Sequence, residues 1–222
     1  MRSFIRDSWT NDLPKNVCYV FLYDKPEYIP IQEQFDGLSI NATHEGRAVR
    51  FGEKLYRYYS YVINNPNLKN VKYVVKMDDD LVLCAAKFFN YLNTQNLTTK
   101  SYLGWFHNMN TWKSKVDVNH RSDEMFVLIG RDLVGQIASK EYCKEKTRSI
   151  CDSLGHLYDT NYGGTSLGIW LETINNVNPI PMNHVFNHMN TNKELKPEDS
   201  LLFHATKTPI IAEEKYANCQ RI

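Results

Sequence analysis

The sequence predicts a single α/β domain in which a mostly parallel central sheet is flanked by helices. A β-branched and aromatic run at residues 17–23 has the length and composition of a buried strand. From Ala48 onward, apolar residues recur at steps of three and four, which places them on one face of a helix. A second apolar run at residues 71–77 is too short for a helix. The order strand, helix, strand is typical of a sheet with parallel strands.

The remaining elements continue this pattern. The segment Asn64-Asn65-Pro66 is expected to stop the first helix, because proline disfavours helical backbone in the residue before it. The near-continuous apolar character of residues 71–77 indicates a central parallel strand. Further along, the patterns predict helices at residues 85–92, 131–140 and 167–174 and strands at residues 102–106, 125–129 and 201–203. Since no repeat or long linker divides the chain, we expect residues 1–222 to form one domain.

Composition excludes several classes of protein. Hydrophobic residues make up 42% of the chain and charged residues 23%, which is ordinary for a folded protein and excludes disorder, collagen and coiled coils. The 26 Lys and Arg against 25 Asp and Glu give a net charge of +1, so no strong field attracts nucleic acid or an anionic membrane. No stretch approaches the roughly 20 apolar residues of a membrane span, and the N-terminus has no signal-peptide core. Read alone, the chain is soluble.

The cysteines and two sequons point towards an oxidising compartment. None of the five cysteines forms a Cys-x-x-Cys pair, which disfavours a zinc site. Cys143 and Cys151 flank a short charged segment and could close a disulfide loop. Asn41 and Asn96 each begin an N-glycosylation sequon. Because sequons arise often by chance, these residues alone leave the compartment open.

Three adjacent carboxylates, Asp78, Asp79 and Asp80, directly follow the most convincing buried strand. On extended backbone Asp78 and Asp80 would share one side, where two carboxylates can hold Mg²⁺ or Mn²⁺. Open α/β sheets also bind ligands at the carboxyl ends of their strands. A solvated acidic turn is the alternative, but apolar residues on both sides of the triplet favour the metal site.

Histidines and a further aspartate are less decisive. His184 and His188 lie four residues apart without the glutamate of a zinc-protease motif, so a surface or core role is favoured. His204 ends the apolar run 201–203 and could complete a metal shell, although spacing alone favours a hydrogen-bonded histidine at a strand end. Asp159 precedes a Gly-Gly pair and an amphipathic helix, and is either a turn residue or a general base. Phosphate-loop, dinucleotide-binding and nucleophile-elbow motifs do not occur.

Several of these segments, in order, resemble the β-1,3-galactosyltransferase family, which includes β-1,3-N-acetylglucosaminyltransferases and fringe-like enzymes. Residues 2–9, Arg-Ser-Phe-Ile-Arg-Asp-Ser-Trp, look like the family's Arg-x-x-Ile-Arg-x-Thr-Trp segment. Residues 73–80, Tyr-Val-Val-Lys-Met-Asp-Asp-Asp, are very close to its Tyr-Val-Leu-Lys-x-Asp-Asp-Asp motif. Residues 126–134 look like its Tyr-Val-Leu-Ser-x-Asp-Leu-Val block. The likeness covers residues 2–206, and the triple-aspartate block is its most specific part.

The resemblance implies a GT-A-like nucleotide-sugar-binding fold and an inverting hexosyltransferase that uses a UDP-sugar and Mn²⁺, with Mg²⁺ as the alternative cation. By analogy, Asp80 would coordinate the metal that bridges the UDP phosphates. Asp78 and Asp79 would lie near the ribose and the sugar. Arg6 and Lys76 belong to the matched motifs and are the further predicted substrate-binding residues.

The resemblance also gives His204 and Asp159 roles. His204 would match the family's late metal-binding histidine. The family's general base is the aspartate of a Glu-Asp-Val-x-x-Gly block, and Asp159 takes that role if Gly163 is the matched glycine. If Gly164 is matched instead, Thr160 falls on the base, which is unfavourable for catalysis.

Two departures from the family matter. Residues 121–125, Arg-Ser-Asp-Glu-Met, replace a glycine-rich stretch on the acceptor side. The family's N-terminal signal anchor and stem are also missing. We therefore expect the native form to be a Golgi membrane protein whose lumenal catalytic domain is this chain.

The expected reaction is one direct displacement. Asp159 takes a proton from the 3-hydroxyl of an acceptor glycan on a glycoprotein or glycolipid, and that oxygen attacks the anomeric carbon of the donor. The donor is UDP-galactose, UDP-N-acetylglucosamine or UDP-N-acetylgalactosamine.

One alternative to the transferase is a non-catalytic UDP-sugar or glycan-binding module, which the altered Glu-Asp block favours. A less favoured one is metal-dependent phosphoryl transfer, which needs a further acidic ligand nearby.

Overall fold

The computed structural model describes residues 1–42, 51–106, 121–143, 147–159, 163–187, 199–203 and 208–220. In these residues the chain is a mixed α/β protein, which confirms the predicted fold class at that level. None of the described helices is long and apolar enough to cross a bilayer.

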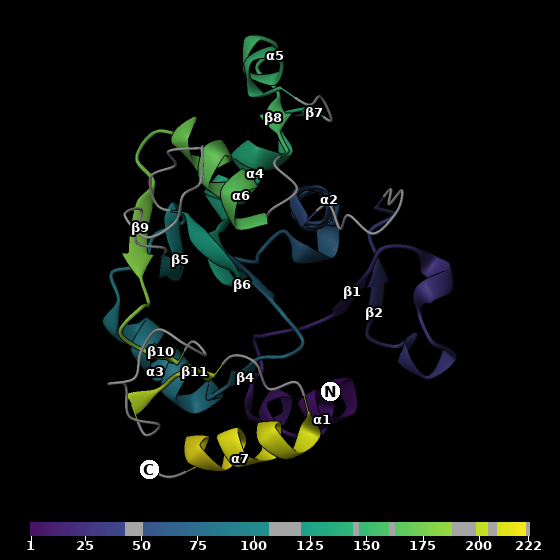
Figure 1. Cartoon of the computed structure of the whole chain (residues 1–222), viewed down its shortest axis with the longest axis vertical. Helices are drawn as coiled ribbons and strands as arrows, with labels where there is room; N and C mark the ends of the chain where they lie inside the picture. The colour runs from purple at the N-terminus through teal and green to yellow at the C-terminus, as the bar shows by residue number, and fades with distance from the viewer. Residues whose placement is uncertain are drawn as a thin grey trace.

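A four-stranded sheet occupies the middle of the molecule, in the order β3-β6-β5-β9 (Figure 1). Its strands are β3 (Tyr73–Met77), β5 (Ser101–Phe106), β6 (Ser122–Gly130) and β9 (Asn178–Pro181). β6 is antiparallel to both β3 and β5, and β9 is parallel to β5.

The prediction of a mostly parallel central sheet is therefore wrong. β3 lies at the edge of the sheet described and pairs antiparallel, rather than forming a central parallel strand. The crossover through α3 (Ala85–Thr94) does give β3 and β5 the same direction, as expected. β6, however, lies between them, and an antiparallel partner needs no crossover helix. An apolar run identifies a strand but does not set its direction.

Helices cover both faces of this sheet (Figure 1). One face is covered by α2 (Phe51–Asn64), α4 (Arg131–Ala138) and α6 (Gly163–Glu172). On the other face α3 packs against β6, and α1 (Arg2–Asp7) and α7 (Pro209–Cys219) extend the same core further out, where α7 contacts β4 (Val82–Leu83). β6 contributes to both cores, because successive side chains of a strand point to opposite faces. Phe126 and Leu128 join the core under α3 and α7, whereas Val127 and Ile129 join the core under α2, α4 and α6.

Three smaller sheets surround this centre. β1 (Phe21–Tyr23) is parallel to β2 (Gly37–Ser39), and β7 (Tyr142–Cys143) is parallel to β8 (Leu157–Tyr158). α5 (Arg148–Ser153) lies between β7 and β8 in the chain and projects from one end of the molecule (Figure 1). The third sheet has the order β10 (Phe186–Asn187), β11 (Leu202–Phe203) and β4 (Val82–Leu83). Short 3₁₀ helices occur at Trp9–Asp12, Pro26–Tyr28, Ile31–Glu33 and Pro66–Leu68.

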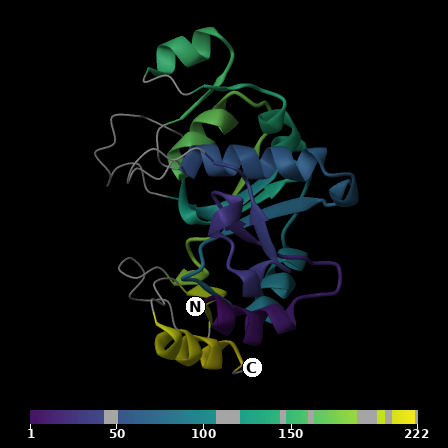
Figure 2. The same cartoon turned by 90° about the vertical axis from the view of Figure 1, so that its right-hand side faces the viewer.

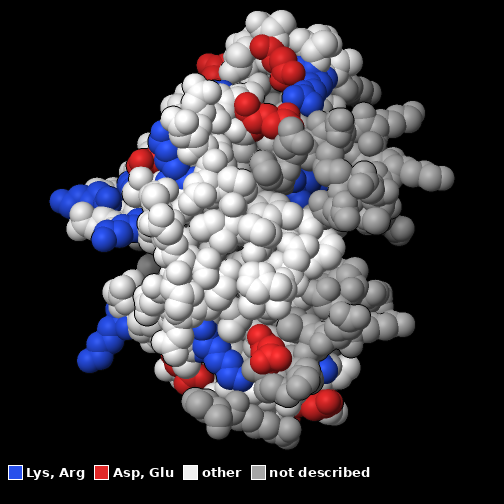
Figure 3. Space-filling view, turned by 90° about the vertical axis from the view of Figure 1, so that its left-hand side faces the viewer, with Lys and Arg blue, Asp and Glu red and all other residues white. Residues whose placement is uncertain are grey.

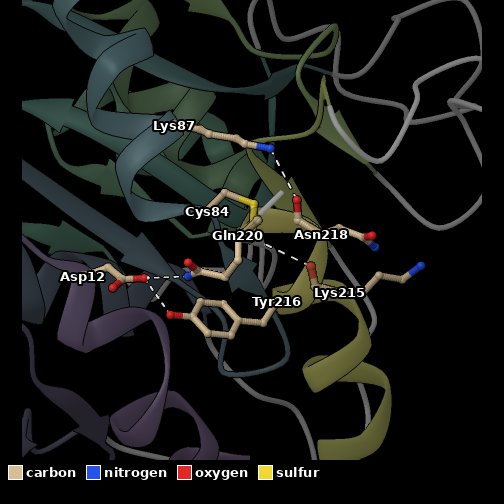
Figure 4. Close-up of a disulfide and its surroundings, with 8 residues drawn as sticks. Asp12, Cys84, Lys87, Lys215, Tyr216, Asn218 and Gln220 are labelled. Carbon is tan, nitrogen blue, oxygen red and sulfur yellow. Dashed lines mark hydrogen bonds between the residues drawn. A yellow bond between two sulfur atoms is a disulfide. The ribbon is translucent and has the colours of Figure 1, made fainter. Parts of the chain in front are cut away.

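Two disulfides join distant and local parts of the chain. Cys143 is bonded to Cys151, as their spacing predicted. Cys84, at the start of α3, is bonded to Cys219 at the end of α7 (Figure 4). Cys18 is an exposed free thiol.

Polar contacts surround the second disulfide. Tyr216 on α7 donates to Oδ2 of Asp12 at 2.6 Å, and Nζ of Lys87 lies 3.4 Å from the carbonyl of Asn218 (Figure 4). These contacts join α7 to the first 3₁₀ helix and to α3, and the ring of Tyr216 also packs edge-on against Phe4 of α1.

Gly130→Ala should lower the free energy of unfolding by about 3 kcal/mol, the upper part of the range for overpacking. Gly130 ends β6, and a Cβ atom there would lie 2.2 Å from the backbone oxygen of Thr99, which cannot rotate away. Urea unfolding measures the loss. Gly135→Ala in α4 is the control, because its Cβ would meet no atom closer than 3.9 Å and alanine favours helix. Equal unfolding midpoints for the two variants would contradict the prediction.

Candidate functional site

The aspartate triplet lies in a tight turn that joins β3 to β4. The backbone N–H of Asp78 donates to the carbonyl of Met125 at 2.9 Å, which anchors the start of the turn to β6. Leu81, at its end, is fully buried. The triplet is thus held by the core on both sides, as predicted. Asp79 and Asp80 are in a turn rather than on extended backbone, so strand alternation does not decide which side chains share a face.

Asp78 is a partly buried carboxylate, with a side chain that is 32% exposed. Burial raises the pKa of Asp78 above its ordinary value, against the opposing effect of Lys76, whose ammonium group is in direct contact with it. The neighbouring charges of Asp80 and Asp79 raise that pKa further. One carboxylate oxygen of Asp80 is also shielded from solvent. Crowded, partly desolvated carboxylates of this kind favour a nearby cation.

Arg2 reaches the turn from the N-terminal helix. Its Nε lies 3.4 Å from Oδ2 of Asp79, and its Nη1 donates to the hydroxyl of Tyr23 at 2.6 Å. The guanidinium also lies 4.7 Å from the centre of the Tyr23 ring. Arg2 therefore connects the aspartate turn to β1, a role that the sequence analysis missed. Its spacing of four residues from Arg6, which places both on one face of α1, was the available signal.

Arg6 is engaged in a bidentate pair with Asp36. Its Nε lies 2.8 Å and its Nη2 2.9 Å from the two carboxylate oxygens, and Glu33 lies 3.4 Å from the same Nη2. These partners raise the pKa of Arg6 further above its already high value, against the effect of burial. The structure thus brings Arg6 to β1 and the start of β2, rather than into described contact with the aspartate turn.

Glu33 and Tyr23 complete this cluster with a short hydrogen bond. Burial acts to raise the pKa of Glu33, but the hydrogen bonds from Tyr23 and Arg6 and the two arginine charges outweigh it, so the pKa is lowered. Burial, together with the bond to Glu33, raises the pKa of Tyr23 to about 12. The cluster is therefore an ionised Glu33 held by two cations and a neutral tyrosine.

Asp159 directly follows β8 and is held by three other elements. The hydroxyl of Tyr142 on β7 donates to its Oδ2, and the hydroxyl of Ser166 on α6 lies 3.3 Å from its Oδ1. In the first turn of α2, a Cβ atom at Gly52 would lie only 2.6 Å from Oδ1. The absence of a side chain at Gly52 is what makes room for this carboxylate.

Of the three histidines considered in the sequence, His184 lies within the described residues, and His188 and His204 lie outside them. His204 lies outside the described residues, but the residue before it, Phe203, pairs with Val82 in the antiparallel ladder of β11 and β4. Val82 is two residues from Asp80, so the end of β11 lies beside the strand that follows the aspartate turn. His184 is exposed in a turn and packs edge-on against Tyr91, with ring centroids 6.0 Å apart, as its surface interpretation predicts. His188 lies outside the described residues.

Charge on the described surface is mixed. On the face that carries β9, acidic and basic side chains lie above and below a largely uncharged middle (Figure 3). Within the described residues, no group of three or more His, Cys, Asp or Glu side chains is arranged to hold a metal ion. His204, the predicted partner of Asp80, is not among these residues.

The chain was also compared with known proteins. No family model matches it. A search of curated proteins finds no match either.

Proposed function

We propose that this protein is a metal-dependent inverting hexosyltransferase, which moves galactose or an N-acetylhexosamine from a UDP-sugar to the 3-hydroxyl of an acceptor glycan. The observation that carries the proposal is the aspartate turn after β3, with the end of β11 in register beside it. Its resemblance to the triple-aspartate motif of β-1,3-galactosyltransferases supports the same reading.

The residues of the turn fit a hard divalent cation. Mn²⁺ and Mg²⁺ prefer oxygen ligands, and the turn presents three adjacent carboxylates, of which Asp78 and Asp80 are partly buried. In the proposal Asp80 and His204 hold the metal. Asp78 and Asp79 face the ribose and the sugar. When bound, the metal neutralises the charge that grows on the departing diphosphate.

Two basic residues support the turn. Lys76 and Arg2 contact Asp78 and Asp79 and so fix the orientation of these carboxylates before the donor binds. The sequence predicted Arg6 as a substrate-binding residue, and no described contact joins it to the aspartate turn. Because Asp36 already engages its guanidinium, we propose that Arg6 acts by holding Glu33 and β2 against α1.

Asp159 is the proposed general base. Its carboxylate accepts the proton of the acceptor hydroxyl as that oxygen bonds to the anomeric carbon, while the bond from that carbon to the diphosphate breaks and UDP leaves. The hydrogen bonds from Tyr142 and Ser166 orient the carboxylate for this step.

In this proposal the domain faces the Golgi lumen, and the native protein is anchored in the Golgi membrane. The two disulfides fit an oxidising compartment. Asn41 and Asn96, which begin the two sequons, are both exposed.

Calorimetric titration with UDP tests the proposal. We expect binding with Mn²⁺ and no binding with excess EDTA. Asp80→Asn should weaken binding by at least about 100-fold, because loss of a residue behind a metal ligand already costs 10- to 100-fold. The control is Asp152→Asn, which changes an exposed aspartate paired with Arg148 on α5.

A screen of UDP-sugars for transfer follows. No UDP binding by the folded chain under either condition would refute the proposal. UDP binding without transfer would identify a non-catalytic module, and hydrolysis of phosphate esters without a sugar acceptor would indicate phosphoryl transfer.

A further inference from the structure

We propose that an open groove along α2 binds the acceptor as a neutral oligosaccharide, an inference that rests on the proposed transferase function. The groove has a volume of about 910 Å³, and is lined by α2, the end of β2 and the connection from α4 to β7. Figure 2 faces this side of the molecule, where α2 lies across it. The lining residues on α2 run from Glu53 to Asn64, over which the helix rises by about 16 Å at about 1.5 Å per residue, so the groove is elongated.

The one cation among the described lining residues is paired with a buried carboxylate, which favours an uncharged ligand. Glu53 is 1% exposed, and its Oε1 lies 2.8 Å from both Nε and Nη2 of Arg57. Arg57 is the one Lys or Arg among the described residues that line the groove. Glu141 lies 3.2 Å from Nε2 of His156. A phosphate would therefore meet an arginine whose charge Glu53 offsets, together with the exposed carboxylate of Glu141. Neutral hydroxyl groups could accept from the remaining N–H groups of Arg57 without that repulsion.

Aromatic rings and amides supply the rest of the lining. Tyr56 and Tyr142 are stacked, with ring centroids 5.3 Å apart. Their hydroxyls donate to the carbonyl of Lys140 and to Asp159 respectively, so the rings are held in place. Tyr61 is 38% exposed. Flat, partly exposed rings beside groups that both donate and accept match a sugar, which has apolar faces and a rim of hydroxyls.

The groove adjoins the proposed general base. Tyr142 lines it, and the hydroxyl of the same tyrosine donates to Asp159. Gly52, which touches Asp159, precedes Glu53 in the first turn of α2. A saccharide that lies along α2 would thus end beside the carboxylate that accepts a proton from its hydroxyl. The aspartate turn is built by β3 and β4, so donor and acceptor approach from different elements.

The test is titration of the ¹⁵N-labelled full chain with N-acetyllactosamine, without UDP or metal, followed by NMR. Expression in cells that do not N-glycosylate avoids competition from a glycan on Asn41, which lines the groove. We expect shifts at α2 and β7, binding about 10-fold weaker in Tyr61→Ala, and retained binding in Tyr61→Phe, because the ring supplies most of the contact. Tyr28→Ala is the control, since Tyr28 is 55% exposed on the 3₁₀ helix after β1.

Each outcome separates the groove from the transferase. Saccharide binding that Tyr61→Ala weakens, in a chain that never binds UDP, would support the groove and refute the transferase. Transfer from a UDP-sugar with an acceptor KM that Tyr61→Ala does not change would refute acceptor binding in the groove. The proposed transferase function would then stand. If neither N-acetyllactosamine nor methyl β-galactoside changes the chemical shifts of the α2 residues, acceptor binding in the groove would also be refuted.

Discussion

Asp159→Asn should lower the rate of sugar transfer by about 10³-fold, in the middle of the range for loss of a general base. Asparagine has nearly the same shape as aspartate, and its carbonyl oxygen can still accept the hydrogen bond from Tyr142. Its amide cannot take the proton of the acceptor hydroxyl. Because the aspartate turn is built by other elements, UDP binding with Mn²⁺ should be unchanged. Steady-state kinetics and calorimetry on the same preparation measure both quantities.

A second variant moves the same carboxylate without replacing it. The Cβ of Gly52→Ala would lie 2.6 Å from Oδ1 of Asp159 and 2.8 Å from the hydroxyl of Ser166, so both side chains must shift. We expect slower sugar transfer and unchanged UDP binding in Gly52→Ala. Gly135→Ala is the control, because its Cβ atom would lie 3.9 Å from the nearest atom. Unchanged transfer in Asp159→Asn would assign the base to another residue and would leave the aspartate turn as the nucleotide site.

The sequence predicted local elements well where the pattern was long or its end was marked. α2 ends at Asn64, two residues before Pro66, as the restriction before proline requires. β3 lies within the apolar run at residues 71–77. By contrast, only residues 21–23 of the expected strand 17–23 form β1, because tertiary pairing with β2 begins there.

Elements whose burial depends on distant partners were missed. α7 has little amphipathic pattern of its own, and it packs through Ala212 and Cys219 on a core formed by other segments. One local signal was available, since Thr208 caps the helix by accepting from the N–H of Ile211, and Pro209 occupies its first turn. The Thr-Pro pair was therefore a stronger signal for this helix than hydrophobic periodicity, although the sequence analysis did not use it.

The candidate site shows the same division. The position of Asp78 to Asp80 after a buried strand was predictable, because it depends on neighbours in the chain. The cluster of Arg2, Tyr23 and Glu33 was not, because its contacts join residues separated by 10 to 31 positions. Only the fold brings α1 against β1 and the 3₁₀ helix that ends at Glu33.

Loss of the disulfide between Cys84 and Cys219 should cause the largest change in stability. In the chain-entropy account, closing a loop of 135 residues stabilises the fold by about 5 kcal/mol, against about 2.5 kcal/mol for the 8-residue separation of Cys143 and Cys151. Replacing both cysteines of each pair with serine avoids free thiols. Urea unfolding then compares the two double variants, and the local pair is the matched control.

The long-range disulfide also bears on the proposed site. Cys84 is four residues after Asp80, and its backbone N–H donates to the carbonyl of Leu201 at 2.9 Å, which holds β4 against the segment that enters β11. Without the disulfide, α7 is held by the apolar packing of Ala212, the exposed hydrogen bond from Tyr216 to Asp12 and the partly buried one from Lys87 to the carbonyl of Asn218. We therefore expect weaker UDP binding as well as lower stability in the Cys84 and Cys219 variant, and unchanged UDP binding in the Cys143 and Cys151 variant. Equal losses of stability in the two double variants would contradict the prediction that the longer loop makes the Cys84–Cys219 disulfide the more stabilising one.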